Sequence, residues 1–307
     1  MDTYYDIIII GSGPAGLSAA LYAGRAKMKT LVIEQASYGG QITSTAEIEN
    51  YPGSLPEESG LSLVTRMRDQ AIKFGAEFLA DQVIAVDFKT SPKGVFTFGA
   101  DYFAKAVIIA SGASPMKLSC PGEEKLTGRG ISYCATCDAA FFEGLPVYVV
   151  GGGDAAVEEA MYLTKFASEV TIIHRRDQLR AAKSIQEKAF ANPKIKFMYD
   201  SFVKEFIGED KLDAMLVQNI KTGEVTKVEH DMFGVFEFIG FKPATELYED
   251  QLSLEFGYIK TDEEMETAIE GVFAAGDCRV KSLRQVVTAA SDGAIAAVNA
   301  AKYIENL

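Results

Sequence analysis

The sequence predicts an α/β protein with two domains, each built around a parallel β-sheet. Two β-branched apolar runs, Tyr5 to Ile10 and Pro146 to Val150, each lead directly into a glycine-rich turn and then into a stretch typical of a packed helix. The two strand–turn–helix units are in register at a constant offset, so that Gly11 corresponds to Gly151. A length of 307 residues also suits about two domains.

Charge and hydropathy exclude several functional classes. The chain has 30 Lys and Arg against 43 Asp and Glu, and this net charge of −13 argues against binding nucleic acid or an anionic membrane. Its longest apolar run, Ile7 to Ile10, falls far short of the ~20 residues that a membrane span requires. The acidic start, Met1 to Asp6, does not resemble a signal peptide. We therefore expect a soluble, cytoplasmic protein.

The first glycine turn has the spacing G-x-G-x-x-G. Gly11 permits a tight turn, Gly13 lets backbone amides approach a pyrophosphate at the helix N-terminus, and Gly16 allows helix and strand to pack closely. A second apolar strand, residues 29–34, ends at Glu34. A carboxylate there accepts hydrogen bonds from ribose hydroxyls and repels a 2′-phosphate, which favours FAD or NAD.

The second turn, Gly151 to Ala156, is followed by a strand over residues 169–173 that ends at His174. His174 lies 23 residues after the first glycine of its turn, as Glu34 does in the first unit. Three arginines follow: Arg175, Arg176 and Arg180. A solvated basic face is the ordinary interpretation of such a cluster, but its match to the position of Glu34 favours binding of the 2′-phosphate of NADP.

Two further segments complete the first domain. Residues 106–113 are expected to form a strand that ends in small residues, and residues 271–275 another strand, which leads to Asp277. Asp277 is equally suited to accept hydrogen bonds from ribityl hydroxyls or to cap a loop. The helix expected after Leu283 would place its N-terminus where it can stabilise electron density on a reduced ring. Together, the two units predict a flavoprotein that exchanges hydride with NADPH.

The four cysteines favour redox chemistry. Cys134 and Cys137 form a C-x-x-C pair, whereas Cys120 and Cys278 are isolated and are expected to be structural. A zinc site usually needs four ligands, and the two histidines lie far from the pair in sequence, so no metal site is expected.

These motifs in combination resemble bacterial low-molecular-weight thioredoxin reductases. The motifs are G-S-G-P-A-G, G-G-Q at 39–41, N-Y-P-G at 50–53, C-A-T-C-D, G-G-G-D-A-A, H-R-R-D-x-x-R and G-D-C-R with L-R-Q-V-V-T-A-A-S-D-G. The resemblance covers essentially the whole chain. It implies two Rossmann-like dinucleotide-binding domains in a homodimer, with an FAD domain (1–115 and 244–307) interrupted by an inserted NADPH domain (116–243) that carries the C-x-x-C pair.

The resemblance also implies the site residues. Those for FAD are Gly11, Gly13, Pro14, Ala15, Gly16, Glu34, Gly40, Gln41, Asn50, Val83, Gly112, Asp277, Arg284, Gln285 and Val286. Those for NADPH are Gly151, Gly153, Asp154, Ala156, His174, Arg175, Arg176 and Arg180. Cys137 would face the flavin, Cys134 would attack thioredoxin, and Asp138 would move protons for the dithiol, although a surface acid is the simpler interpretation of Asp138. Ala155, Leu179 and Ala244 depart from the common family pattern.

The expected activity is the reduction of thioredoxin disulfide by NADPH through FAD and the Cys134–Cys137 pair. Since the dithiol and the nicotinamide would share the inserted domain, we expect a hinge rotation that presents them to the flavin in turn. Two other activities stay open: a flavin-dependent thioredoxin reductase that uses ferredoxin, and a dithiol oxidase that acts on a small molecule. A non-enzymatic flavin sensor would leave the C-x-x-C pair without a purpose.

Overall fold

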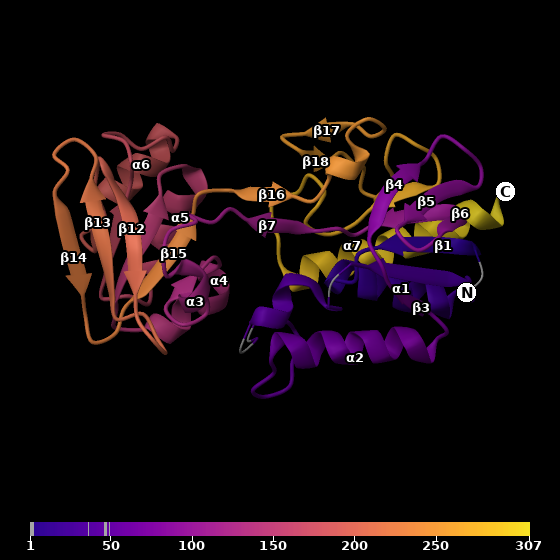
Figure 1. Cartoon of the computed structure of the whole chain (residues 1–307), viewed down its shortest axis with the longest axis horizontal. Coiled ribbons are helices and arrows are strands. Elements are labelled where there is room, and N and C mark those ends of the chain that lie inside the picture. Colours follow the sequence, from indigo (N-terminus) through magenta and orange to yellow (C-terminus); the bar gives the residue numbers. More distant parts are fainter. Residues whose placement is uncertain (1–2, 36, 46–47, 49) are drawn as a thin grey trace. The chain divides into compact units, whose positions relative to one another are not determined.

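The computed structural model describes residues 3–35, 37–45, 48 and 50–307 (Figure 1). Residues 1–2, which belong to the acidic start, lie outside the described part, as do 36, 46–47 and 49. The chain divides into two compact units. Unit 1 consists of Met1–Ser114 and Lys242–Leu307, and unit 2 of Pro115–Phe241.

Unit 1 is built on a sheet with the strand order β3-β2-β1-β6-β5-β4, in which β19 pairs with the C-terminal part of β6. The strands are β1 (Tyr4–Ile10), β2 (Thr30–Glu34), β3 (Glu77–Ala80), β4 (Val83–Asp87), β5 (Lys93–Thr97), β6 (Asp101–Ile109) and β19 (Val272–Ala274). β1, β2, β3, β6 and β19 pair in parallel, whereas β4 and β5 are antiparallel additions. The C-terminal ends of the parallel strands therefore meet at one edge, where α/β proteins bind ligands.

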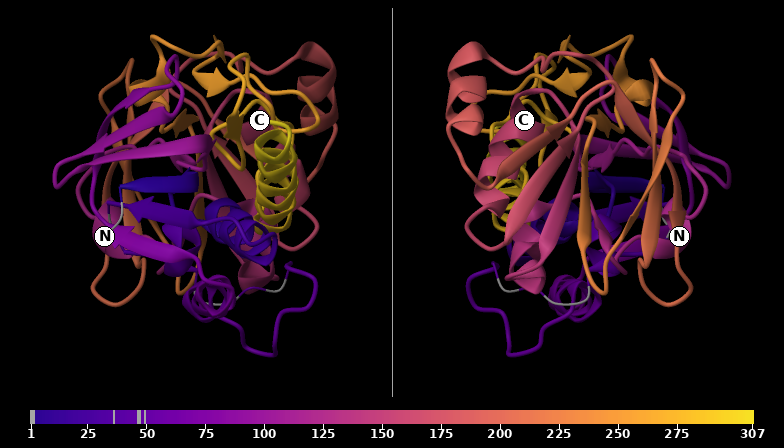
Figure 2. Two further views of the ribbon diagram at one scale, coloured as in Figure 1. Left: turned by 90° about the vertical axis from the view of Figure 1, so that its right-hand side faces the viewer. Right: turned by 90° about the vertical axis from the view of Figure 1, so that its left-hand side faces the viewer.

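The central strand of unit 1 is buried on both faces, as its run of isoleucines predicts. Ile8 and Ile10 belong to one hydrophobic cluster, and Ile7 and Ile9 to the cluster on the opposite face. Helices α1 (Pro14–Arg25) and α7 (Val286–Glu305) cover the second face (Figure 2). The remaining elements are α2 (Gly60–Lys73), the 3-10 turns η1 (Gly40–Ser44) and η3 (Glu246–Tyr248), and the hairpin of β17 (Leu254–Glu255) and β18 (Tyr258–Ile259).

Unit 2 contains a parallel sheet with the strand order β11-β10-β9-β15-β8 and an antiparallel sheet, β12-β13-β14. The strands are β8 (Ile131–Ser132), β9 (Pro146–Gly151), β10 (Glu169–Ile173), β11 (Ile195–Met198), β12 (Ser201–Ile207), β13 (Ala214–Asn219), β14 (Val225–Glu229) and β15 (Gly234–Phe238). The helical elements are α3 (Glu123–Leu126), α4 (Ala135–Asp138), η2 (Ala139–Phe142), α5 (Asp154–Leu163) and α6 (Lys183–Phe190). The predicted α/β class with two parallel sheets is confirmed. No helix in the described part of the chain is long and apolar enough to cross a membrane.

The chain passes between the units at two places, and the strands there pair with each other. β7 (Ala113–Pro115) and β16 (Phe241–Pro243) form a two-stranded sheet. Beyond these strands, the Met116 amide donates to the Gly240 carbonyl at 2.9 Å and the Ala244 amide donates to the Gly112 carbonyl at 3.0 Å. The Ser111 hydroxyl also donates to the Ala244 carbonyl at 2.6 Å. The backbone of Ala244 is thus held on both sides, even though its side chain departs from the family pattern.

Candidate functional site

The first glycine turn connects β1 to α1, and sterics explain each glycine. Gly11 has φ +104°, and a Cβ there would lie 2.3 Å from the Ala110 carbonyl oxygen. A Cβ on Gly16 would lie 2.0 Å from the Gly11 carbonyl oxygen, so α1 packs closely against the turn. At Gly13, the N-cap of α1, a Cβ would meet nothing nearer than 4.0 Å. The turn is therefore closed toward the protein and open at Gly13, where a ligand can approach the helix N-terminus.

Pro14 and Ala15 open α1. Pro14 occupies the first helical turn, where its missing N–H leaves no helical hydrogen bond unmade. Ala15 is buried, and a Cβ on Gly276 would come within 2.8 Å of the Ala15 methyl group. The start of α1 therefore packs against the turn that follows β19.

Glu34, the last residue of β2, contacts this turn directly. Its Oε2 accepts hydrogen bonds from the Ser12 amide and the Ser12 hydroxyl, each at 2.9 Å. Gly40 lies against the same turn, since a Cβ on Gly40 would be 3.1 Å from the Gly13 Cα. Gln41 follows, and its amide donates to the Ala113 carbonyl. The structure thus brings Glu34, Gly40 and Gln41 to the predicted nucleotide edge of unit 1.

Val83 and Gly112 occupy other parts of this edge. Val83 begins β4, and its side chain is buried in the core of unit 1, so only its backbone could face a nucleotide. The Asp81 amide donates to the Glu34 carbonyl at 3.0 Å, which brings this segment to the end of β2. Gly112 has φ +73°, and a Cβ there would meet nothing within 4 Å.

Asp277 follows β19 and carries a buried side-chain oxygen, Oδ1. Among the described residues, no hydrogen-bond donor reaches its Oδ1. Burial raises the pKa of this carboxyl group, while Lys281 and Arg284 oppose the rise. A buried carboxylate oxygen without a partner is costly, so a ligand that brings a hydroxyl donor fits this position. The ribityl chain of a flavin has such hydroxyls.

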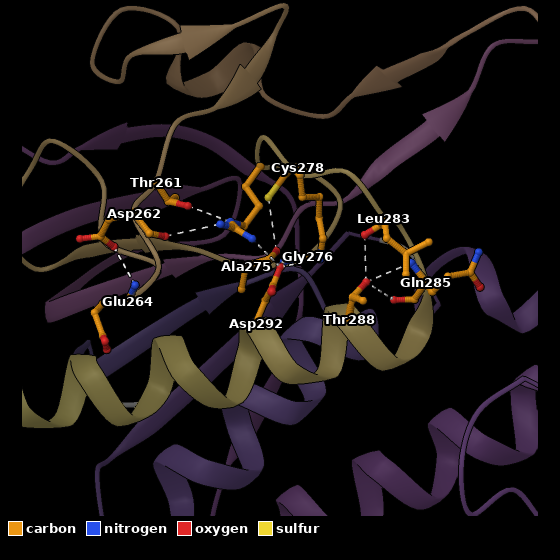
Figure 3. Close-up of polar contacts among 12 residues, drawn as sticks. Thr261, Asp262, Glu264, Ala275, Gly276, Cys278, Leu283, Gln285, Thr288 and Asp292 are labelled. Atoms are coloured by element: carbon orange, nitrogen blue, oxygen red, sulfur yellow. Dashed lines mark hydrogen bonds and ion pairs between the residues drawn. The ribbon is translucent and has the colours of Figure 1, made fainter. Parts of the chain in front are cut away.

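Asp292, a residue of α7, binds the turn that precedes Asp277 (Figure 3). Asp292 Oδ2 accepts from the Gly276 amide at 3.0 Å, from Lys281 Nζ at 2.7 Å and from Arg279 Nη1 at 3.3 Å. The side chains of Asp292 and Lys281 are both buried. Asp292 was not among the predicted site residues, because the sequence alone does not show that this position of α7 meets the turn after β19.

The N-terminus of α7 carries the remaining predicted flavin residues. Gln285 caps the helix, and its backbone N–H donates to the Thr288 hydroxyl at 3.2 Å (Figure 3). Asn50 donates to Gln285 Oε1 at 3.2 Å, which ties the segment at residue 50 to this helix. The Arg284 guanidinium lies over the Tyr258 ring, 4.1 Å from its centroid. Val286 is the first residue of α7, so the predicted helix starts three residues after Leu283.

The second glycine turn, in unit 2, repeats the geometry of the first. Gly151 has φ +153°, and a Cβ there would lie 2.5 Å from the Phe238 carbonyl oxygen. At Gly153, the N-cap of α5, a Cβ would meet nothing within 4 Å. Ala156 replaces the third glycine and is fully buried, with its methyl group packed under Gly151. This turn is also closed toward the protein and open at its second glycine.

His174 packs against the second turn. A Cβ on Gly152 would lie 2.3 Å from His174 Nδ1, so only glycine fits between the turn and this ring. The ring is buried, and its Nε2 has no partner among the described residues. Burial and the neighbouring arginines lower its pKa. His174 is therefore neutral at pH 7 and supports the turn without adding charge to it.

The three arginines after His174 are exposed beside the turn. The Arg180 amide donates to the Gly152 carbonyl at 2.6 Å, and Asp154 Oδ1 accepts from the Ala182 amide at 2.7 Å. Asp154, a predicted nucleotide residue, therefore secures the arginine-bearing loop to α5. Within the described residues, neither Arg175, Arg176 nor Arg180 forms a salt bridge. These cations are available to an anionic group bound at the turn.

Cys134 and Cys137 form a disulfide at α4, in the same unit as the second turn. The buried Ala135 and Ala139 join the hydrophobic core of unit 2, and this anchors the motif. Both cysteines are half-buried. The short helix thus presents a disulfide from a rigid base.

Asp138 is connected to Cys134 through Ser132. The Ser132 hydroxyl donates to Asp138 Oδ2 at 2.5 Å and accepts from the Cys134 amide at 3.1 Å. Burial raises the pKa of Asp138, although the bond from Ser132 opposes the rise. A raised pKa suits a group that exchanges protons with a dithiol. The sequence held no signal for Ser132 beyond its place two residues before Cys134.

Cys120 and Cys278 lack the features of reactive thiols. Burial raises the pKa of Cys120 to about 12 and that of Cys278 to about 11. Cys278 is fully buried, and its thiol lies 3.4 Å from the Ala275 carbonyl oxygen (Figure 3). Thiols with such values remain protonated at neutral pH and are poor nucleophiles.

Comparison with known proteins identifies the family. The profile of the pyridine nucleotide-disulphide oxidoreductases matches residues 5–293. The chain belongs to this family. Thioredoxin reductase of Peptoclostridium litorale is 58% identical over 312 residues, covering 100% of this chain and 99% of the relative. That of Bacillus subtilis (strain 168) is 48% identical and covers 99% of this chain and 96% of the relative.

A solved structure extends the comparison to the fold. The crystal structure of thioredoxin reductase from Streptococcus pyogenes MGAS5005 matches with a TM-score of 0.95 at 48% identity, covering 100% of each chain. The resemblance inferred from the motifs is therefore confirmed, and so is the expected two-domain Rossmann-like architecture. The chain is an oxidoreductase, and its family implies the use of a flavin and a nicotinamide nucleotide.

Proposed function

We propose that this oxidoreductase is an NADPH-dependent thioredoxin-disulfide reductase. The main support is the disulfide of Cys134 and Cys137, which lies beside Asp138 in the same unit as a glycine turn flanked by three exposed arginines. The names of the full-length relatives agree with this proposal. The reaction is NADPH + H⁺ + thioredoxin disulfide → NADP⁺ + thioredoxin dithiol.

We assign FAD to unit 1 and NADPH to unit 2. For FAD, the open face of Gly13 would receive the pyrophosphate, Glu34 the adenosine ribose, and the buried Oδ1 of Asp277 a ribityl hydroxyl. For NADPH, Gly153 offers the corresponding open face, and the exposed arginines would receive the 2′-phosphate. The FAD domain would thus be formed by two separate stretches of the chain.

The chain's own residues then carry out the disulfide chemistry. FAD held in unit 1 would supply the two-electron chemistry that links NADPH to the Cys134–Cys137 disulfide. The Cys134 thiolate attacks the thioredoxin disulfide and forms a mixed disulfide, and Cys137 attacks Cys134 to release the thioredoxin dithiol. Asp138, held by Ser132, moves the proton that accompanies the exchange. The paired crossings β7 and β16 would act as the hinge that presents dithiol and nicotinamide in turn.

We further propose thioredoxin as the partner, a homodimer as the assembly and the cytoplasm as the location. A hollow of mixed polar and apolar lining on unit 1, between α1, α2 and α7, supports the dimer. Tyr22 and Val287 line it and are exposed in the single chain. A cytoplasmic location suits an enzyme that keeps protein thiols reduced.

The proposed function is tested by following flavin absorbance without oxygen. We expect NADPH to bleach the flavin quickly, NADH to do so far more slowly, and oxidised thioredoxin to restore the colour. Bleaching by reduced ferredoxin but not by NADPH would contradict the assignment of NADPH as the electron donor. Bleaching that no thioredoxin reverses would contradict the acceptor and favour a small-molecule disulfide.

Replacing Gly153 with Ala separates nucleotide binding from folding. The added methyl group meets no protein atom within 4 Å, and the lower entropy of the unfolded chain offsets the weaker capping by Ala at this N-cap position, so we expect little change in the melting temperature. The methyl group would obstruct the pyrophosphate. Overpacking costs about 1–3 kcal/mol, and its lower part, about 1.4 kcal/mol, corresponds to a tenfold higher KM for NADPH. Thermal unfolding and steady-state kinetics measure the two effects.

Gly16→Ala is the contrasting variant, because its methyl group would lie 2.0 Å from the Gly11 carbonyl oxygen and should destabilise unit 1. An unchanged KM in Gly153→Ala would contradict the assignment.

A further inference from the structure

Unit 2 contains two buried carboxyl groups that the proposed reaction does not use. Glu123, in α3, and Glu237, in β15, are each 2% exposed. Glu123 accepts hydrogen bonds from the Tyr133 hydroxyl at 2.8 Å, the Leu118 amide at 3.2 Å and the Cys120 amide at 3.3 Å. With three donors on its two oxygens, Glu123 is well solvated as a carboxylate.

Glu237 has a much poorer set of donors. Its Oε2 accepts one long bond, from the Leu118 amide at 3.4 Å, and its Oε1 is buried without a partner among the described residues. Neither carboxyl group forms a salt bridge within the described part of the chain. Lys117 is the cation that acts on Glu237, and it is exposed and attracts only weakly. An ionised Glu237 would therefore be a buried charge with almost no compensation.

The two carboxyl groups lie close together, because the Leu118 amide donates to both of them, to Glu123 Oε1 at 3.2 Å and to Glu237 Oε2 at 3.4 Å. Two ionised carboxylates so close together inside the protein would repel each other, so we expect one of the two groups to keep its proton. Glu123 already accepts three bonds, whereas Glu237 has an oxygen to spare, so the proton belongs on Glu237. Burial and the Glu123 carboxylate raise the pKa of Glu237 to about 8.

The pair also contacts the segment that leads into the redox motif. Phe236 of β15 pairs with Ser132, the last residue of β8. The next residues along the two parallel segments, Glu237 and Tyr133, therefore occupy neighbouring positions. Tyr133 precedes Cys134 and is held by Glu123 through its hydroxyl. Burial keeps the Tyr133 hydroxyl and the Cys120 thiol protonated by raising the pKa of each, so neither competes for the shared proton near neutral pH.

We propose that Glu237 and Glu123 share one proton at neutral pH and that this proton positions Tyr133, and with it the start of the Cys134–Cys137 motif. Loss of the proton places two carboxylates close together inside the protein, and their repulsion weakens the hydrogen bond that Tyr133 donates to Glu123. The motif is then anchored less firmly. Glu237 is thus a positioning residue that makes the motif sensitive to alkaline pH. This inference does not depend on which disulfide the enzyme reduces.

The sign of the pH effect follows from linkage. Glu237 has a folded-state pKa above its ordinary value of 4.5, so its contribution to stability is complete below pH 4.5 and is lost as pH rises to about 8. Above that value Glu237 is ionised in both states and no further loss occurs. Between pH 4.5 and about 8, the unfolding equilibrium constant of the wild type should rise about tenfold per pH unit relative to that of Glu237→Gln.

The test uses the full-length oxidised protein with its cofactors. Infrared difference spectra of wild type minus Glu237→Gln at pH 7 should contain the carbonyl stretch of one protonated carboxyl group, lost with a midpoint near pH 8. Hydrogen exchange of residues 131–138, corrected for intrinsic rates, should become about tenfold faster above this midpoint in the wild type. Glu237→Gln, which keeps the shape without the charge, should abolish the step. Glu124→Gln, an exposed neighbour with the same charge change, should retain it.

Tyr133→Phe completes the design because it removes the link and leaves the carboxyl pair in place. It should keep the infrared band and lose the step in hydrogen exchange. Absence of the band at pH 7 would overturn the shared proton. A step that persists in Glu237→Gln would overturn its positioning role. Either failure would leave the proposed NADPH and thioredoxin reactions untouched.

Discussion

Cys134→Ser is expected to lower the rate of thioredoxin reduction on the order of a thousandfold or more, while NADPH still reduces the flavin at the normal rate. Disulfide exchange requires a thiolate, and a serine hydroxyl does not ionise near neutral pH. Cys134 is the N-cap of α4 and Cys137 lies within this short helix, which is anchored by the buried Ala135 and Ala139, so the substitution should not disturb the fold. Stopped-flow absorbance of the flavin, with NADPH alone and then with thioredoxin, measures the two half-reactions separately.

Two further variants assign the roles of the thiols. Cys137→Ser should also abolish turnover, but it should retain thioredoxin as a stable mixed disulfide on Cys134, because the thiol that resolves this intermediate is missing. Cys120→Ser is the matched control: burial raises the pKa of that thiol to about 12, so its loss should leave the rate within about twofold. Mixed-disulfide capture by Cys134→Ser instead of Cys137→Ser would reverse the assignment of attacking and resolving thiol.

The local parts of the site could be predicted from the sequence. Gly11 and Gly151 stand at the same point of two matching strand–turn–helix units, and both adopt the positive φ angles that such a turn requires. Glu34 is the last residue of β2, His174 directly follows β10, and both contact their turns. Spacing along the chain is sufficient here, because each turn is built from neighbouring residues.

Contacts between distant segments could not be predicted in this way. Asp292 meets Gly276 only because α7 packs across the end of β19. Glu237 meets Glu123 only because β15 pairs beside β8. His174 occupied the right position, but its burial against Gly152 depends on the ring's orientation, which no spacing reveals. Side chains whose role depends on tertiary packing leave no periodic or motif signal.

Replacing both Arg175 and Arg176 with Ala is expected to lower kcat/KM for NADPH roughly a hundredfold and to leave that for NADH within about twofold. A charge-assisted hydrogen bond contributes ~1.5–3 kcal/mol, and ~1.4 kcal/mol corresponds to a factor of ten. Both arginines are exposed and form no salt bridge within the described residues. Solvent screening therefore places the contribution of each arginine near the lower limit of this range. Each single substitution should therefore cost about tenfold.

NADH lacks the 2′-phosphate that NADPH carries on its adenosine ribose, so the loss must be confined to NADPH if the arginines bind that group. Steady-state kinetics with both nucleotides at several salt concentrations measure this selectivity, which should also shrink as ionic strength rises. Arg129→Ala removes the same charge from another exposed position of unit 2 and should change neither value. Equal losses for NADPH and NADH would instead show that the arginines support the fold of the loop after β10, and the assignment of NADPH to unit 2 would lose its electrostatic basis.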